Sequence, residues 1–110
     1  MTALGVIRVG DLGTYIEIDF VDTNSADVNS PLDISHNVNK ITIVDPDGNQ
    51  NGPFTMTLVN TGTDGKAFYI TSLVTSIWTK GGMWRWFGTA DTGNRTVSTN
   101  DALREVLNKP

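Results

Sequence analysis

The chain has 110 residues, eight lysines and arginines against twelve aspartates and glutamates, a net charge of −4 and no cysteine. This length suits one domain, and the lack of cysteine excludes disulfides, thiolate metal sites and a cysteine nucleophile. The basic residues are scattered and form no stripe that could neutralise phosphates, and no apolar stretch is long enough to cross a bilayer. We therefore expect neither nucleic acid nor a membrane as a partner.

Alternating apolar and polar residues, interrupted by turn residues, predict a series of short β-strands. The clearest segment is 14–22, in which Ile16, Ile18 and Phe20 share one side and acidic residues occupy the other. Turns separate the strands, as at 45–48 (Asp-Pro-Asp-Gly), where proline presets φ and glycine accepts a left-handed conformation. The expected strands are residues 6–9, 14–22, 40–44, 54–60, 66–72, 83–90 and 95–98.

Two segments lack this alternation. Residues 23–39 are rich in Asn, Asp, Ser and Pro, which predicts a long surface connection held against the core by Leu32 and Ile34. Residues 73–80 leave two interpretations open, a single helical turn or the bent end of a strand, before a pair of glycines ends the segment.

The period of the pattern changes near the C-terminus. The apolar residues that recur there at helical spacing are Ala102, Leu103, Val106 and Leu107. Together these patterns predict an all-β fold: an antiparallel β-sandwich of about seven strands over residues 1–98, followed by a short C-terminal helical tail over residues 99–110.

The aromatic segment 83–90 carries large apolar side chains on both faces. Trp84 and Trp86 share one face, whereas Met83, Arg85 and Phe87 share the other. We place the two tryptophans in the core and the other three residues in an interface with a partner, because a large exposed apolar patch needs a cover. The expected core residues are Ile16, Ile18, Phe20, Ile41, Ile43, Trp84 and Trp86.

Trp78 is a further candidate for the interface. It precedes the glycine pair, so we expect partial exposure and a contact with a partner. One alternative is that all three tryptophans belong to the core. Another is that Trp78 and nearby aromatic residues stack on sugar rings.

No residue pattern indicates catalysis, a cofactor or a metal. Residues 45–51 alternate Asp and Asn like the oxygen ligands of a calcium loop, but Met56 stands where an acidic ligand is required, which favours a polar turn. His36 is the only histidine and is interpreted as a solvated loop residue. No pair of carboxylates is singled out, so a small hydrolase is the least favoured class. We expect no catalytic, cofactor-binding or metal-binding residues.

Several short segments occur in an order and spacing that suggest a family. They are IRVGDLGT (7–14), LDIS (32–35) before KITI (40–43), DPDG (45–48), GTDGK (62–66) and GMW (82–84). Over residues 6–98 the chain resembles the N-terminal immunoglobulin-like domain of bacteriophage baseplate upper proteins and related small phage structural proteins. The resemblance implies a non-catalytic β-sandwich in the virion that holds a tail or fibre component, with the late-strand tryptophan, here Trp84, in its core.

This resemblance sets the expected function. It implies a virion structural subunit of the tail, baseplate or neck that binds other virion proteins, as a homo-oligomer within a symmetric assembly. The first alternative is a head-surface decoration subunit. The second is a carbohydrate- or cell-surface-binding module that uses an exposed tryptophan, with a host glycan as partner. The N-terminus lacks a signal-peptide pattern, so we expect synthesis in the host cytoplasm and location in the virion.

Overall fold

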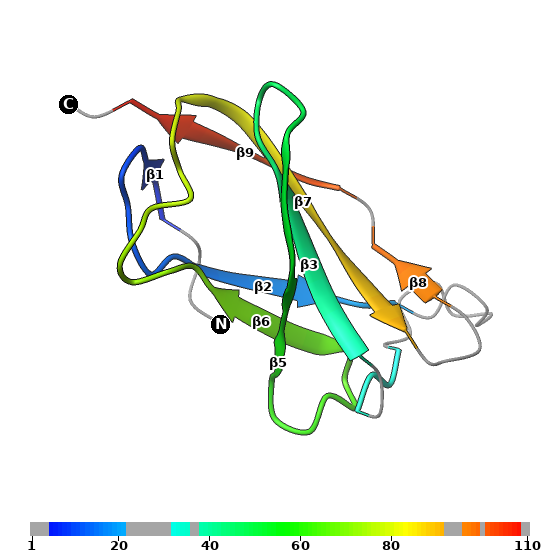
Figure 1. The fold of residues 1–110 in the computed structure, drawn as a ribbon. Helices are drawn as coiled ribbons and strands as arrows, with labels where there is room; N and C mark the ends of the chain where they lie inside the picture. Colours follow the sequence, from blue (N-terminus) through cyan, green and yellow to red (C-terminus); the bar gives the residue numbers. More distant parts are fainter. Residues whose placement is uncertain (1–4, 22–31, 36–37, 92–95, 100, 109–110) are drawn as a thin grey trace.

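The computed structural model describes residues 5–21, 32–35, 38–91, 96–99 and 101–108, and these residues form nine β-strands and no helix. The strands are β1 (Ile7–Arg8), β2 (Tyr15–Asp19), β3 (Val38–Val44), β4 (Gln50–Thr55), β5 (Thr57–Leu58), β6 (Lys66–Ile70), β7 (Gly82–Asp91), β8 (Thr96–Ser98) and β9 (Ala102–Leu107). The chain is therefore all-β in the part that the structure describes (Figure 1).

The strands are arranged in two sheets. The larger sheet has the order β1-β9-β7-β3-β4, with β8 also paired to β7, and the smaller sheet has the order β2-β6-β5. β1 runs parallel to β9, whereas the other pairings are antiparallel. The larger sheet is thus mixed, and the expectation of a purely antiparallel fold is wrong at this pair. Parallel neighbours need a long connection, and here almost the whole chain separates the two strands.

The core lies between the two sheets. Gly88 on β7 marks a point of close approach, because an added Cβ would lie 2.8 Å from both Ile18 Cγ2 and Phe20 Cζ on the smaller-sheet side. The rings of Trp78 and Trp84 meet edge to face, with centroids 5.0 Å apart. All the residues expected in the core are buried, none more than 6% exposed: Ile16, Ile18, Phe20, Ile41, Ile43, Trp84 and Trp86.

The predicted C-terminal helix over 99–110 is wrong. Residues Ala102–Leu107 form β9, which pairs with β7 from Trp86↔Ala102 to Gly82↔Val106 and with β1 on its other side. The apolar residues Ala102, Leu103, Val106 and Leu107 are separated by one, three and one positions. This spacing fits a helix, and it also fits a strand that is partly covered on both faces. A helix of this length is marginal by itself, whereas the ladder supplies backbone hydrogen bonds on two sides. The two-sheet unit therefore continues beyond residue 98.

Two further predictions change in detail. The single strand expected over 54–60 is two strands in different sheets, because the chain passes from the larger to the smaller sheet at Met56. There the Met56 N–H donates to Asn39 O at 2.9 Å, and the side chain is buried. Residues 73–80 form neither a helical turn nor a strand end but a loop of bends.

Candidate interaction surface

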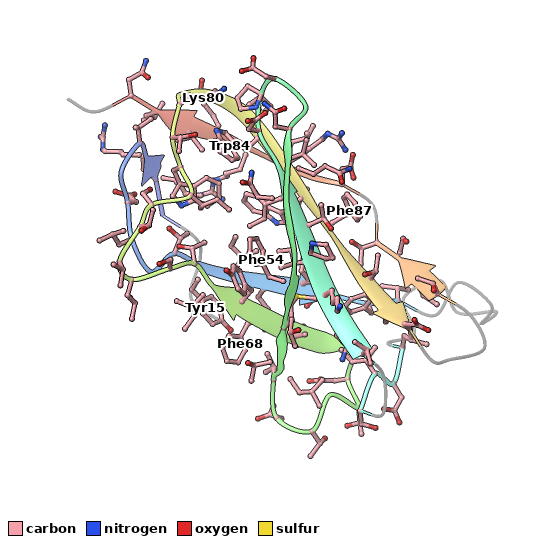
Figure 2. The ribbon with its side chains drawn as sticks, in the orientation of Figure 1. Tyr15, Phe54, Phe68, Lys80, Trp84 and Phe87 are labelled. Atoms are coloured by element: carbon pink, nitrogen blue, oxygen red, sulfur yellow. The ribbon has the colours of Figure 1, made fainter. Side chains whose placement is uncertain are left out.

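The outer face of β7 points away from the core. Along the strand, burial alternates: Trp84 and Trp86 are buried, whereas Met83 is exposed and Phe87 is half-buried. Figure 2 shows Phe87 on the opposite side of the molecule from Tyr15 and Phe68 of the smaller sheet. Arg85 shares the outer face with them, so three of the four residues singled out for an interface lie together.

Strand β9 extends this outer face. Its register with β7 sets Leu103 opposite Arg85 and Glu105 opposite Met83. Met83 is 54% exposed, Leu103 66% and Val6 64%, which is unusual for large apolar side chains that lie close together. We call the open hollow here the β9 depression; its lining residues are Val6, Met83, Leu103, Arg104, Glu105 and Leu107.

Charged groups of both signs surround the β9 depression. Arg85 Nη1 donates to Asp101 Oδ2 at 3.1 Å, and both side chains are partly exposed. Arg104 donates through Nη2 to the carbonyl oxygen of Gly5. Exposed ion pairs such as these contribute little stability. This surface can therefore bind a partner mainly by burying apolar side chains, with the charged groups at the rim of the contact.

The fourth candidate, Trp78, does not belong to this surface. Its side chain is fully buried, and its indole Nε1–H donates to Thr14 Oγ1 at 2.9 Å. Because that hydroxyl satisfies the only polar group of the indole, complete burial costs no unpaired donor. The indole Nε1–H of Trp84 likewise donates to Lys80 O, at 3.0 Å. The expected partial exposure of Trp78 is therefore wrong. All three tryptophan side chains are buried, so none of them offers an exposed ring on which a sugar could stack.

A second apolar surface was missed by the sequence analysis. Leu73 is 74% exposed and Val74 87%, near the beginning of the loop that follows β6, and Leu12 is exposed in the loop between β1 and β2. We call Leu12, Leu73 and Val74 the apolar tip. Two apolar residues between Ser72 and Thr75 were the available signal, but they also fitted a helical turn.

Hydrogen bonds hold the loop of the apolar tip in place. Ser72 Oγ accepts the N–H groups of Val74 and Thr75, each at 3.1 Å. Ser76 Oγ donates to Asp11 O at 2.7 Å and joins this loop to the β1–β2 loop. These hydrogen bonds fix the path of the loop and hold it against the β1–β2 loop.

The Asp45 turn has the geometry of a capped hairpin. Asp45 Oδ1 accepts the N–H groups of Asp47 and Asn49, each at 2.9 Å, and Lys80 Nζ lies 3.8 Å from Oδ2 and also bonds Asp47. Burial raises the pKa of Asp45, but the hydrogen bonds from Asn49 and Asp47 and the charge of Lys80 together hold it below its ordinary value. Protein donors therefore occupy the oxygens that a calcium ion would need.

Other candidate chemistry adds nothing to these surfaces. No group of three or more His, Cys, Asp or Glu side chains suited to a metal occurs among the described residues, and His36 lies outside them. No helix in the described ranges is long and apolar enough to span a membrane.

Fold and surfaces together define a small two-sheet β-protein with two exposed apolar features. The sequence matches no protein-family model, and no curated protein matches it.

Proposed function

We propose that this chain is a non-catalytic structural subunit of a bacteriophage particle, with an immunoglobulin-like β-sandwich fold and a place in the tail, baseplate or neck. The observation that carries the proposal is the exposed apolar outer face of β7 and β9. Met83, Leu103 and Val6 are each more than half exposed on one side of the larger sheet. Burial of such surface contributes roughly 25 cal/mol per Å², so an assembly neighbour would be stabilised by covering it.

The segments that resemble phage structural proteins add support. Their glycines have positive φ, which residues with a side chain rarely adopt. Five of these glycines lie in turns or loops between strands, namely Gly10, Gly13, Gly48, Gly62 and Gly65, and Gly82 is the first residue of β7. The segments that carry the resemblance therefore include glycines whose backbone conformation this fold requires.

The test is the composition of phage particles released by cells that carry this gene. We expect the chain in particles purified by density gradient, at several copies each by quantitative mass spectrometry. Gold-labelled antibody should mark the tail, baseplate or neck in electron micrographs. Absence of the chain from purified particles would overturn the proposal, and label confined to the head surface would replace it with a decoration role.

A further inference from the structure

Strand β2 forms one edge of the smaller sheet. It pairs with β6 on one side, and no strand in the described part of the chain pairs with Tyr15–Asp19 on the other. Thr14 O and Phe20 N–H, both at even-numbered positions, bond to backbone groups at the two ends of β6. In an antiparallel ladder every second residue bonds to the same neighbour. The backbone groups that point to the open edge are therefore those of Tyr15, Glu17 and Asp19.

The backbone of this edge is suited to pairing with another strand. Open N–H and C=O groups are a template for strand addition, and proline or a bulge would block it. β2 contains no proline, and its register with β6 runs without a bulge. Two equal edges related by a two-fold axis run antiparallel, and full alignment sets Glu17 opposite the same residue of the other copy. Glu17 is thus at the centre of the pairing that the backbone permits.

The carboxylate of Glu17 is shielded from solvent without a bonded partner. Its Oε2 is buried and accepts no hydrogen bond from the residues that the structure describes. Lys66 on β6 donates instead to Asp19 Oδ1 at 3.2 Å, and this bond raises the pKa of Lys66 more than the charge of Glu17 does. A shielded, unpaired carboxylate oxygen lowers the stability of the fold. The folding of a single chain therefore does not explain an acidic residue at this position.

We infer that Glu17 prevents β2 from pairing with the β2 edge of a second copy. An added strand would cover the carboxylate further, and a charge without a partner is costly to remove from water. In the aligned pairing two carboxylates would also lie opposite each other, which is destabilising between neighbouring strands. A shift of two residues sets Glu17 opposite Asp19 in one direction, or Asp19 opposite Gly13, beyond the strand, in the other. Every register is thus opposed by charge or shortened.

This role of Glu17 goes beyond the proposed function and does not depend on it. Pairing between two sheet edges needs little more than backbone groups, so it discriminates poorly between partners. Such a contact would compete with any contact on the outer face of β7 and β9, where side chains define the partner. Suppression of an unwanted contact is one of the two ways in which a protein gains specificity. Glu17 is accordingly a specificity-determining residue for association.

Amide hydrogen exchange followed by NMR tests this role at the edge itself. In the parent chain the N–H groups of residues 15, 17 and 19 should exchange rapidly at every protein concentration. Those of Ile16 and Ile18 should be protected, because they face β6. Glu17→Thr removes the charge and supplies a residue that favours strands. We expect its three edge amides to exchange at least about tenfold more slowly at high than at low protein concentration, because pairing protects them.

Two further variants separate the charge of Glu17 from other effects. Glu17→Gln keeps the length of the side chain and removes its charge, so its edge amides should also gain concentration-dependent protection. Asp64→Thr, in the exposed turn before β6, changes the net charge by the same amount and should leave the edge amides unprotected. Protection of Ile16 and Ile18 in each variant shows that the comparison is between folded chains.

Three results would overturn the inference. Edge amides that exchange equally fast at every concentration in Glu17→Thr and Glu17→Gln would show that this charge does not keep the edges apart. Concentration-dependent protection in the parent chain would show that the edges pair despite Glu17. Equal protection in Asp64→Thr would assign the effect to net charge alone. None of these results bears on whether the chain is present in phage particles, so the two proposals fail separately.

Discussion

Backbone atoms of neighbouring segments surround Gly65 closely. Its φ is +80°, its carbonyl accepts the Phe20 N–H at 2.7 Å, and an added Cβ would collide with Phe20 O and lie 3.0 Å from Leu32 O. We expect Gly65→Ala to cost well over the roughly 1–2 kcal/mol of the left-handed conformation alone, because backbone atoms cannot move aside. Urea unfolding would measure the loss.

Gly48 provides the matched control. It also has positive φ, +90°, but an added Cβ would meet nothing within 4 Å. Gly48→Ala should therefore lose only about 1–2 kcal/mol, the conformational cost alone. Equal losses for the two variants would show that space around Gly65 is not the limiting factor.

A substitution at Trp78 can distinguish a role in the core from a role in an interface. Its ring packs against Trp84 and Trp86, with centroids 5.0 and 6.1 Å away, and its side chain is fully buried. We expect Trp78→Ala to lower the free energy of unfolding by about 3–5 kcal/mol. A loss below about 1 kcal/mol in denaturant unfolding would contradict the core assignment.

Strand β9 is the element on which the sequence and the structure differ most. It pairs with both β7 and β1, and Val106 is buried. Removal of residues 101–110 should abolish cooperative thermal unfolding, because β1 loses its pairing partner and β7 loses its pairing with β9 along Gly82–Trp86. A peripheral helical tail would be dispensable, so a truncated chain that melts cooperatively would argue against β9 as a structural strand.

The Asp45 turn makes the free energy of unfolding depend on pH. Because the folded pKa of Asp45 lies below its unfolded value, the stabilisation is present above about pH 3.9, the usual value for aspartate, and is lost as the pH falls through the folded pKa. We expect Asp45→Asn to flatten the decline in unfolding free energy below about pH 4. Urea titrations between pH 6 and 3 measure this, and parallel curves for the two proteins would contradict it.

At the scale of the whole molecule, the two sheets bury one core and leave the outer face of β7 and β9 free for a neighbour. Met83→Asp places a charge on that face without touching the core, since Met83 is more than half exposed. We expect the variant to unfold within about 0.5 kcal/mol of the parent chain. Under the proposed function, it should also be lost from purified phage particles. Thr57→Asp, at an exposed position of β5 in the smaller sheet, should be incorporated normally. Equal incorporation of both variants would exclude the β7–β9 face as a particle contact.

The local pattern of the sequence is sufficient for much of this molecule. Period-two alternation predicts β2 and β7 and assigns Ile16, Ile18, Trp84 and Trp86 to buried faces. It does so because side-chain direction in a strand depends only on parity. Turn residues such as those at 45–48 locate strand ends for an equally local reason, since proline and glycine restrict or permit particular φ values.

The remaining features of the fold depend on contacts between residues that are far apart in the sequence. The apolar spacing of residues 102–107 is compatible with a helix or a strand, and only the open edge of β7, supplied by a segment some twenty residues earlier, makes the strand favourable. The burial of Trp78 likewise depends on a hydroxyl at Thr14, 64 positions away in the chain. The apolar tip and the β9 depression are also products of tertiary structure, because each combines residues from segments whose proximity the sequence does not encode locally.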